Sequence, residues 1–449
     1  MIRAFKRKIH LLDEHTLEVL RKSGLSIIVK VLGMMTWVGS SMILGRTLGV
    51  EGFGIINLSN NIITILLLFC MLGHPQLLMK EIAIGFSQEK WQRIRDYMKS
   101  AYILNGAVAL IISVLFITLA PYISLHIFRE PALTKPLIIA MAVVAPEVFS
   151  RIFSSALTGY RKIWQSNLVD NTLSSGVTFV IILILYVTKH HIDVVIAAYV
   201  YAIGRLTVAL VMGVYWEKIK SYTHQWKGKS SISIMELMKK SYPFIWFGSL
   251  GTLTAILDGV LVGWLANAEQ VGLYSVALRL AMLTSFILAV TNSTVGPKLA
   301  AMYAAKELHA MTKMVHRISF ILISAGAFIL SIFVFGGHFI LSFWGHGFSQ
   351  AYILLVLLST GQFVNIATGP AGFLLIMCGQ ERIHAYISSF SLIFNVLLNY
   401  YLITNYGALG AAVATCLTVS VENIIKVVFA WKYVGVLTIP LNIISKYGK

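Results

Sequence analysis

The sequence predicts an all-α integral membrane protein with twelve transmembrane helices. Twelve apolar stretches follow one another between residues 24 and 431, and short polar loops separate them. A spanning helix needs roughly 20 mainly apolar residues, and each stretch supplies most of that length. The composition agrees, because 57% of the residues are hydrophobic and 12% are charged. Soluble domains usually carry about 25% charged residues, so a soluble fold is excluded.

The predicted spans are bounded by polar or turn-forming residues. They cover residues 24–45, 53–73, 101–122, 136–158, 168–188, 194–216, 243–265, 271–293, 314–336, 350–377, 388–404 and 408–430. Residues 1–22 mix apolar side chains such as Ile2, Phe5 and Ile9 with basic ones. That mixture is typical of an amphipathic helix that lies on the membrane surface. Residues 432–449 are expected to form a polar tail.

Lysine and arginine are distributed unevenly between the two sides of the predicted bundle. With the N-terminus in the cytoplasm, 26 of the 36 basic residues fall in cytoplasmic segments, and only Arg46, Arg129, Lys135 and Lys189 fall outside. Basic loops resist translocation, so we expect both termini in the cytoplasm. The net charge of +18 follows from this topology, and we expect no nucleic-acid partner.

The spans fall into two groups of six. Residues 23–216 form the first group, residues 241–431 form the second, and a cytoplasmic linker with six lysines, residues 217–240, joins them. Because six is even, both halves enter the membrane from the same side, which defines a parallel repeat. The sequence therefore predicts two six-helix bundles around a central cavity.

Two short external turns support an internal duplication. Each half opens with a helix, a tight turn and a second helix, and the two turns can be overlaid at a spacing of 218 residues. Glu51 then aligns with Glu269, and Gly54 aligns with Gly272. Matches at the same topological positions, taken in order, favour duplication over chance.

The same turns carry a resemblance to a known family. Residues 44–58, LGRTLGVEGFGIINL, resemble the first external turn of the polysaccharide transporters, the O-antigen (lipid-linked oligosaccharide) flippases. Residues 270–277, QVGLYSVA, resemble the turn that opens the second half in that family. These flippases belong to a superfamily that also holds the multidrug and toxic-compound extruders (MATE) and the lipid II flippases.

The resemblance implies a MATE-like fold and a transporter that is not an enzyme and needs no cofactor. Its substrate would be a polyprenyl-pyrophosphate-linked oligosaccharide, carried across the bacterial inner membrane by alternating access for O-antigen or other surface polysaccharide synthesis. Besides membrane lipid, a polysaccharide polymerase and a chain-length regulator are the implied partners.

Charged side chains inside the predicted spans divide into two kinds. Glu147 and Arg151 are four residues apart on one helix, as are Glu422 and Lys426. Such spacing lets each pair neutralise itself, so we interpret both pairs as structural. A charge in hydrocarbon is costly, and an intramembrane charge with no opposite charge on its own helix therefore indicates a functional site.

Three cations meet that description: Arg205, Arg279 and Lys30. Arg205 is the strongest candidate, because it lies roughly 16 Å from either end of its span at 1.5 Å per residue. Lys30 lies near the inner end, where its long side chain can also reach the interface. A guanidinium offers a planar fork of donors that matches phosphate oxygens. We therefore expect these three residues to bind the pyrophosphate.

Asp258 is the one acid of this kind, and two interpretations of it remain open. It could bind a coupling H⁺ or Na⁺, or it could pair with Arg279 on the adjoining helix. Its position does not decide between them.

Neutral polar side chains recur at helical spacing on several spans. A sugar needs many neutral donors and acceptors, so these stripes could contact the oligosaccharide; hydrogen bonding between helices is the alternative. The candidate sugar contacts are Asn57, Asn61, Asn171, Gln362 and Asn365, and Asn395 and Asn399 form a further stripe. Gly369-Pro370 is expected to kink or break the tenth span.

Two other functions remain as alternatives. A drug/cation antiporter of the same superfold should carry acids in the core of its first half. A polysaccharide polymerase or ligase should carry a large external loop, for which the short loops leave no room. The three cysteines show no metal-binding or disulfide spacing, and neither a catalytic residue nor a metal site is predicted.

Overall fold

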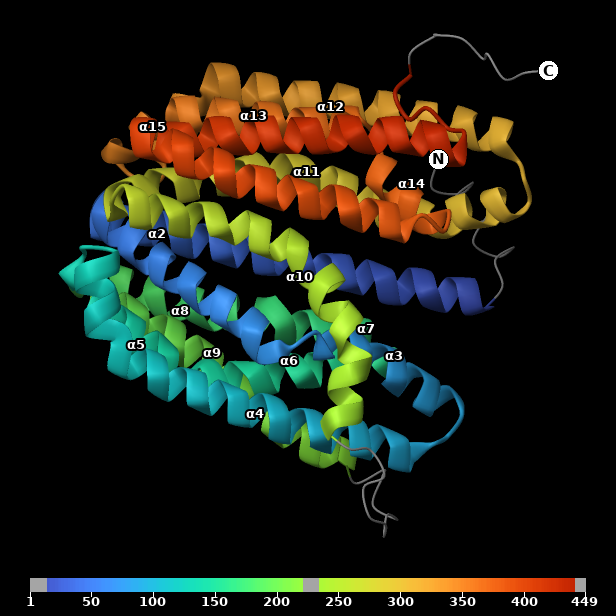
Figure 1. Ribbon diagram of the computed structural model, residues 1–449. Helices are drawn as coiled ribbons and strands as arrows, with labels where there is room; N and C mark the ends of the chain where they lie inside the picture. Colours follow the sequence, from blue (N-terminus) through green and yellow to red (C-terminus); the bar gives the residue numbers. More distant parts are fainter. Residues whose placement is uncertain (1–13, 221–233, 441–449) are drawn as a thin grey trace. The chain divides into compact units, whose positions relative to one another are not determined.

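The computed structural model describes residues 14–220 and 234–440, and all regular structure in those two ranges is helical (Figure 1). Seven helices are long and apolar enough to cross a membrane, or up to nine if each of two bent pairs counts as one span. The predicted all-α membrane fold is therefore confirmed, whereas the count of twelve spans stays a prediction. Two of the long helices contain a break.

Both breaks are single glycines. Helix α2, Glu14–Met71, is interrupted at Gly49 (φ 69°, ψ −174°), and α15, Glu381–Val434, is interrupted at Gly407 (φ 58°, ψ −138°). Side chains disfavour these backbone conformations, and glycine adopts them readily. Helix therefore continues on both sides of Gly49, and a single non-helical glycine lies where the sequence predicts a turn between the first two spans.

The chain divides into two compact units. Unit 1 comprises Met1–Leu48, Ile62–His126 and Pro131–Ser249, and unit 2 comprises Gly49–Asn61, Ile127–Glu130 and Leu250–Lys449. Helix α2 thus gives its middle segment to unit 2 and its flanks to unit 1. Helix α10 likewise gives its beginning to unit 1 and its end to unit 2.

Unit 1 is built around α6, which packs against α3, α4 and α9 (Figure 1). Its helices are α3 His74–Ser87, α4 Trp91–Tyr122, α5 Thr134–Ala142, α6 Val144–Gly159, α7 Ile163–Asn167, α8 Leu173–Val187 and α9 Val194–Lys220, with short turns η1 Ile123–Ile127, η2 Pro131–Leu133 and η3 Leu168–Thr172. The helix pair around α5 and α6 bends by 47°, and the pair around α7 and α8 bends by 43°.

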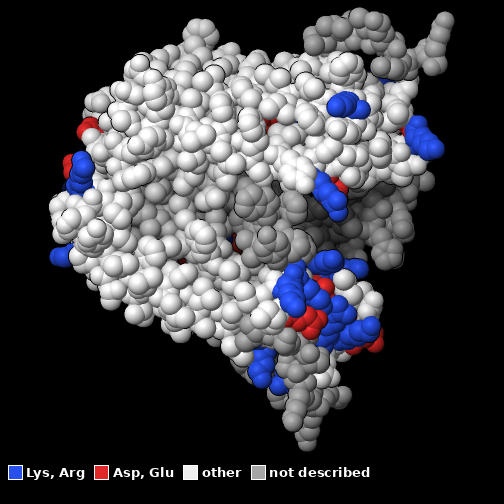
Figure 2. Space-filling model, viewed as in Figure 1, with Lys and Arg blue, Asp and Glu red and all other residues white. Residues whose placement is uncertain are grey.

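Charged residues gather at the end of unit 1 where α3 meets α4 and where α10 begins. Figure 2 shows this patch as the largest group of charged residues on the face in view, whose other charged residues are scattered among uncharged ones. Its exposed basic members are Lys80, Lys90, Arg95, Lys99, Lys239 and Lys240. The prediction placed all of them in cytoplasmic loops.

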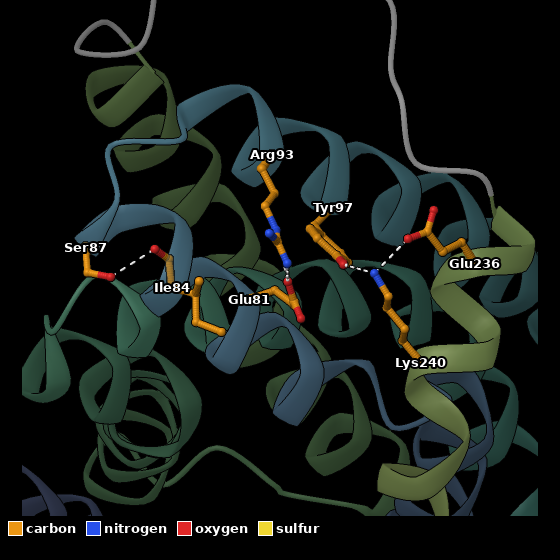
Figure 3. Close-up of polar contacts among 7 residues, drawn as sticks. All are labelled: Glu81, Ile84, Ser87, Arg93, Tyr97, Glu236 and Lys240. Atoms are coloured by element: carbon orange, nitrogen blue, oxygen red, sulfur yellow. Dashed lines mark hydrogen bonds and ion pairs between the residues drawn. The ribbon is translucent and has the colours of Figure 1, made fainter.

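Two ordered contacts hold this end together (Figure 3). Arg93 pairs with the buried Glu81 at 2.5 Å. The Nζ atom of Lys240 donates to Glu236 at 2.7 Å and to the hydroxyl of Tyr97 at 2.9 Å, and it also lies over the Tyr97 ring. The hydrogen bonds to Glu236 and Tyr97 raise the pKa of Lys240 above its ordinary value. The start of α10 is thereby fixed to α4 within unit 1.

Unit 2 is built around α13, which packs against α11, α12 and α15. Its helices are the end of α10 (Ile234–Leu265), α11 Ala268–Ala304, α12 Leu308–Ser342, η5 His346–Ala351, α13 Tyr352–Ala367, α14 Ala371–Met377 and α15. The expected break at Gly369-Pro370 is confirmed, because α13 ends two residues before Gly369 and α14 begins directly after Pro370.

The two turns that the sequence aligns contact each other inside unit 2. A Cβ atom on Gly54 would overlap the backbone oxygen of Ala268, and one on Gly272 would overlap the backbone oxygen of Val50. Only glycine at both positions lets the α2 and α11 backbones approach this closely. Asn267 caps the start of α11 by accepting a hydrogen bond from the amide of Gln270 at 2.9 Å.

Candidate functional site

In unit 1 three charged side chains of the spans, Glu147, Arg151 and Arg205, form a cluster. Glu147 of α6 binds Arg151, one turn further along the same helix, with 3.0 Å between Nη2 and Oε1. Its second oxygen, Oε2, pairs with Nε of Arg205 from α9 at 3.1 Å. Glu147 and Arg205 are mostly buried, whereas the side chain of Arg151 is 35% exposed. Each carboxylate oxygen of Glu147 therefore pairs with one guanidinium group.

This geometry corrects the view of Arg205 as an intramembrane cation without an opposite charge. No acid on α9 can reach it, but packing of α6 against α9 supplies Glu147 from 58 positions earlier in the chain. The predicted pair of Glu147 and Arg151 is confirmed, although it is part of a larger cluster. Asp170, on the neighbouring η3 turn, is close enough to act electrostatically on Arg151.

Lys30 lies elsewhere in unit 1, on α2, and its side chain is exposed. Several apolar side chains near it on α2, including Ile28 and Leu32, are exposed as well. The structure thus leaves Lys30 free to reach either an aqueous space or the membrane interface.

In unit 2, Asp258 of α10 lies in a compact polar cluster. Tyr274 of α11 donates its hydroxyl to Oδ2 at 2.8 Å, Thr415 of α15 donates to the same oxygen at 2.7 Å, and Asn399 of α15 donates to Oδ1 at 2.7 Å. Asp258 is 1% exposed. These three partners are neutral. The alternative pairing with Arg279 stays a prediction.

The break in α15 makes this cluster possible. Asn395 and Asn399 precede Gly407 and Thr415 follows it, so the reversal at Gly407 brings both parts of α15 to Asp258. The amide oxygens of Asn395 and Asn399 are buried and accept no hydrogen bond from the described residues. Asp258 thus combines a buried carboxylate with hydroxyl and amide side chains, and oxygens of these kinds can bind a hard cation or a proton.

Arg279 of α11 is held against α2 within unit 2. Its Nη2 donates to the amide oxygen of Asn57, and its guanidinium lies 5.4 Å from the centroid of the Phe53 ring. The amide nitrogen of Asn57 donates in turn to the carbonyl of Phe53 at 2.6 Å. Asn57 therefore orients Arg279, and a sugar could reach its amide only by displacing these bonds.

The other candidate sugar contacts differ among themselves. Gln362 and Asn365 are half-buried and bind each other at 3.2 Å. Asn61 is half-buried and packs beside Gly259, next to Asp258 on α10. The side chain of Asn171 lies outside the described residues. Hydrogen bonding between helices, the alternative to sugar binding, is thus observed for Asn57.

Sequence reasoning missed several members of these clusters. Tyr274 and Thr415 carried no signal, because single hydroxyl side chains are common in membrane helices. Asn395 and Asn399 were recognised as a stripe, and their spacing of four residues could have indicated one polar face directed at a neighbouring helix. Arg151 and Glu147 were taken only as a self-neutralising pair.

The sequence matches a known protein family. The sequence profile of the polysaccharide biosynthesis proteins matches residues 19–303. The match covers more than half of the chain, and the chain belongs to this family. It is also 24% identical over 183 residues to the "probable low-salt glycan biosynthesis flippase Agl15" of Haloferax volcanii, a match that spans 40% of this chain and 38% of that protein.

Solved structures share the fold over almost the whole chain. A multidrug resistance MATE family transporter of the MOP superfamily, in an inward-facing conformation, has a TM-score of 0.72 at 14% identity, over 91% of this chain and 98% of that one. The lipid II flippase MurJ, in an inward closed conformation, has a TM-score of 0.68 at 15% identity, over 92% and 87% of the two chains. The predicted MATE-like fold is thereby confirmed. These relatives are named as transporters and flippases, not enzymes.

Proposed function

We propose that this protein is a flippase that moves a polyprenyl-pyrophosphate-linked oligosaccharide from the cytoplasmic to the outer leaflet of the bacterial inner membrane. The oligosaccharide would be a unit of O-antigen or of another surface polysaccharide. A polysaccharide polymerase and a chain-length regulator would act on the delivered unit.

The observation that carries this proposal is the pair of arginines inside membrane helices of a polysaccharide biosynthesis protein. Arg205 sits in the middle of α9 and Arg279 within α11, and each is held in a defined orientation by a side chain of another helix. Guanidinium stays charged when it leaves water and binds phosphate oxygens through two donors at once. The pyrophosphate is the part of the substrate that enters lipid least readily, so it is the group that such arginines would stabilise. Lys30 is a third candidate contact.

The transport cycle we propose is alternating access, in which the substrate site opens to one leaflet at a time. We propose that the protein carries it out with twelve spans and with both termini in the cytoplasm. The breaks at Gly49 and Gly407 support this number, because each divides one long helix at the boundary between two predicted spans. The polyprenyl chain would remain in the bilayer throughout.

Asp258 is the group that we propose for ion coupling. It is buried among neutral donors, and two nearby amide oxygens have no donor, so an H⁺ on the carboxylate or a Na⁺ among the oxygens completes the cluster. The proposal requires that Asp258→Asn weakens the dependence of transport on the proton or sodium gradient. Unchanged dependence on both gradients would assign Asp258 to packing alone.

The central experiment replaces the deepest arginine. Arg205→Ala should abolish export of the surface polysaccharide and cause lipid-linked oligosaccharide to accumulate in the inner leaflet. Arg205→Lys should rescue only part of the export, because lysine keeps the charge and loses the planar fork. Membrane insertion is checked by the amount and gel-filtration profile of the purified variants. Normal export by a well-folded Arg205→Ala protein would remove the main support for the flippase.

A drug/cation antiporter is the main alternative, because the protein shares its fold with a MATE transporter. The two functions differ in what their loss causes. An antiporter mutant would retain dye or drug in the cell and export polysaccharide normally. A flippase mutant would expel dye or drug normally and fail to export polysaccharide.

A further inference from the structure

Glu147 occupies the position between two guanidinium groups that an anionic ligand would occupy. Its Oε1 receives Nη2 of Arg151 at 3.0 Å and Nε at 3.3 Å. Its Oε2 lies 3.1 Å from Nε of Arg205, as an ion pair. A phosphate group offers its oxygens to two arginines in the same way.

The cluster is buried but not sealed. Glu147 and Arg205 are each 14% exposed, whereas Arg151 is 35% exposed, so an incoming group can meet Arg151 first. Both cations share the single carboxylate of Glu147. A diphosphate ester carries one charge on each phosphate and can bind both arginines, whereas a carboxylate left between them would repel it.

We propose that Glu147 is an internal substitute for the substrate's phosphates. In the empty transporter it holds Arg151 and Arg205 in their binding positions, and the arriving diphosphate displaces it from one or both. Arg151 then becomes a second diphosphate ligand beside Arg205, and Glu147 regains both arginines when the substrate leaves. This inference rests on the proposed function and adds two residues to its binding site.

If Glu147 competes with the diphosphate for the arginines, removing its charge should strengthen diphosphate binding. If Glu147 only packs against them, removing its charge should not strengthen binding. Glutamine has the shape of glutamate without its charge, so Glu147→Gln removes the competing anion. The affinity for a diphosphate should then rise about tenfold, a typical size for loss of one competing contact. Export should fall at the same time, because the carboxylate of Glu147 is no longer there to displace the diphosphate from the arginines. A purely structural Glu147 predicts unchanged or weaker binding.

The measurement is calorimetric titration of the purified full-length protein with farnesyl diphosphate. Farnesyl monophosphate and farnesol serve as ligand controls, and the gain in Glu147→Gln should be largest for the diphosphate. Arg151→Ala should weaken diphosphate binding by about tenfold or more, in line with the loss of one bidentate contact. Glu422→Gln is the matched control, because it removes the acid of the other intramembrane pair, with Lys426 at 2.6 Å, and should leave the affinity unchanged.

A second variant covers the case in which Glu147→Gln does not fold. Glu147→Asp keeps the charge and shortens the side chain by one methylene, so the carboxylate cannot reach both arginines, and the diphosphate affinity should lie between those of the wild type and Glu147→Gln. If Arg205→Ala abolishes binding while neither Glu147 variant binds more tightly, the substitute role is wrong and the arginine site stands. If Arg205→Ala binds farnesyl diphosphate and exports normally, the proposed function itself fails.

Discussion

Gly54 and Gly272 each lie directly against the backbone of the opposite helix. A side chain on Gly54 would overlap the carbonyl oxygen of Ala268, four residues before Gly272, and a side chain on Gly272 would overlap that of Val50, four residues before Gly54. The contact is thus reciprocal with the same spacing on both helices. It joins the two turns that the sequence aligns as repeats.

This crossing predicts that alanine is not tolerated at either glycine. Gly54→Ala and Gly272→Ala should each cost about 1–3 kcal/mol, the usual penalty for overpacking a tight contact, because backbone atoms must move. Gly176→Ala is the control, since a Cβ there meets no atom within 4 Å. Thermal unfolding of the purified proteins checks this, because Gly54→Ala and Gly272→Ala should unfold at lower temperatures than Gly176→Ala. Equal midpoints for Gly54→Ala and Gly176→Ala would contradict the close approach.

The Asp258 cluster predicts a graded loss of ion affinity. Thr415→Val removes a hydroxyl that bonds Asp258 at 2.7 Å and should weaken the apparent affinity for the coupling ion by about tenfold, as loss of a supporting group typically does. Thr360→Val is the control, because the Thr360 hydroxyl bonds only the carbonyl of Val356. Transport measured against external Na⁺ and against pH separates the two ions. Equal behaviour of both variants would argue against the cluster as the ion site.

The contact between Asn57 and Arg279 predicts a separation of stability from transport. Asn57→Asp places a carboxylate against the guanidinium, which should preserve folding and neutralise the cation, so export should be lost. Asn57→Leu leaves the guanidinium without this acceptor and should cost about 1–3 kcal/mol of stability. Export assays and thermal midpoints of both variants provide the check. Full export by Asn57→Asp would show that the charge of Arg279 is not needed.

The contacts of Lys240 predict a weak stabilisation with a defined pH range. Because the folded pKa of Lys240 is raised by Glu236 and then by Tyr97, its contribution is complete below the ordinary lysine pKa. It is lost as the pH rises through the folded value. The side chain is 40% exposed, so Lys240→Met should cost no more than about 1 kcal/mol. The difference in thermal midpoint should stay constant from pH 7 to about 10 and narrow above that. A difference that disappears near pH 8 would contradict this account.

The predicted topology can be tested with single cysteines. Positions 229 and 446, which lie outside the described residues, should face the cytoplasm, and the exposed His190 should face outward. In intact cells a membrane-impermeant thiol reagent should label only a cysteine at position 190. Native Cys70 and Cys378 are buried and Cys416 is half-buried, so they are replaced first only if background labelling is seen. Labelling at position 229 would overturn the six-plus-six arrangement.

The fold could be predicted from the sequence to a large extent, and the clusters only in part. Apolar length dictates helices in lipid, because only hydrogen bonds within the segment satisfy the backbone there. The turn around Gly49 was predicted, but the sequence does not show that helix continues on both sides of that one glycine. The spacing of Glu147 and Arg151 predicts their pair, but which helix packs against α6 is a tertiary property, so Arg205 could not be assigned to it. Tyr274 and Thr415 are ordinary helix residues until packing brings them to Asp258.

The neutral surroundings of Asp258 bear on how such a protein can change during evolution. An asparagine codon is one nucleotide away from an aspartate codon, and asparagine at this position can still accept hydrogen bonds from Tyr274 and Thr415. Loss of the acid therefore still leaves these two hydroxyl donors with an acceptor. We expect lineages of this family to gain and lose ion dependence at this position while the helices around it stay as they are.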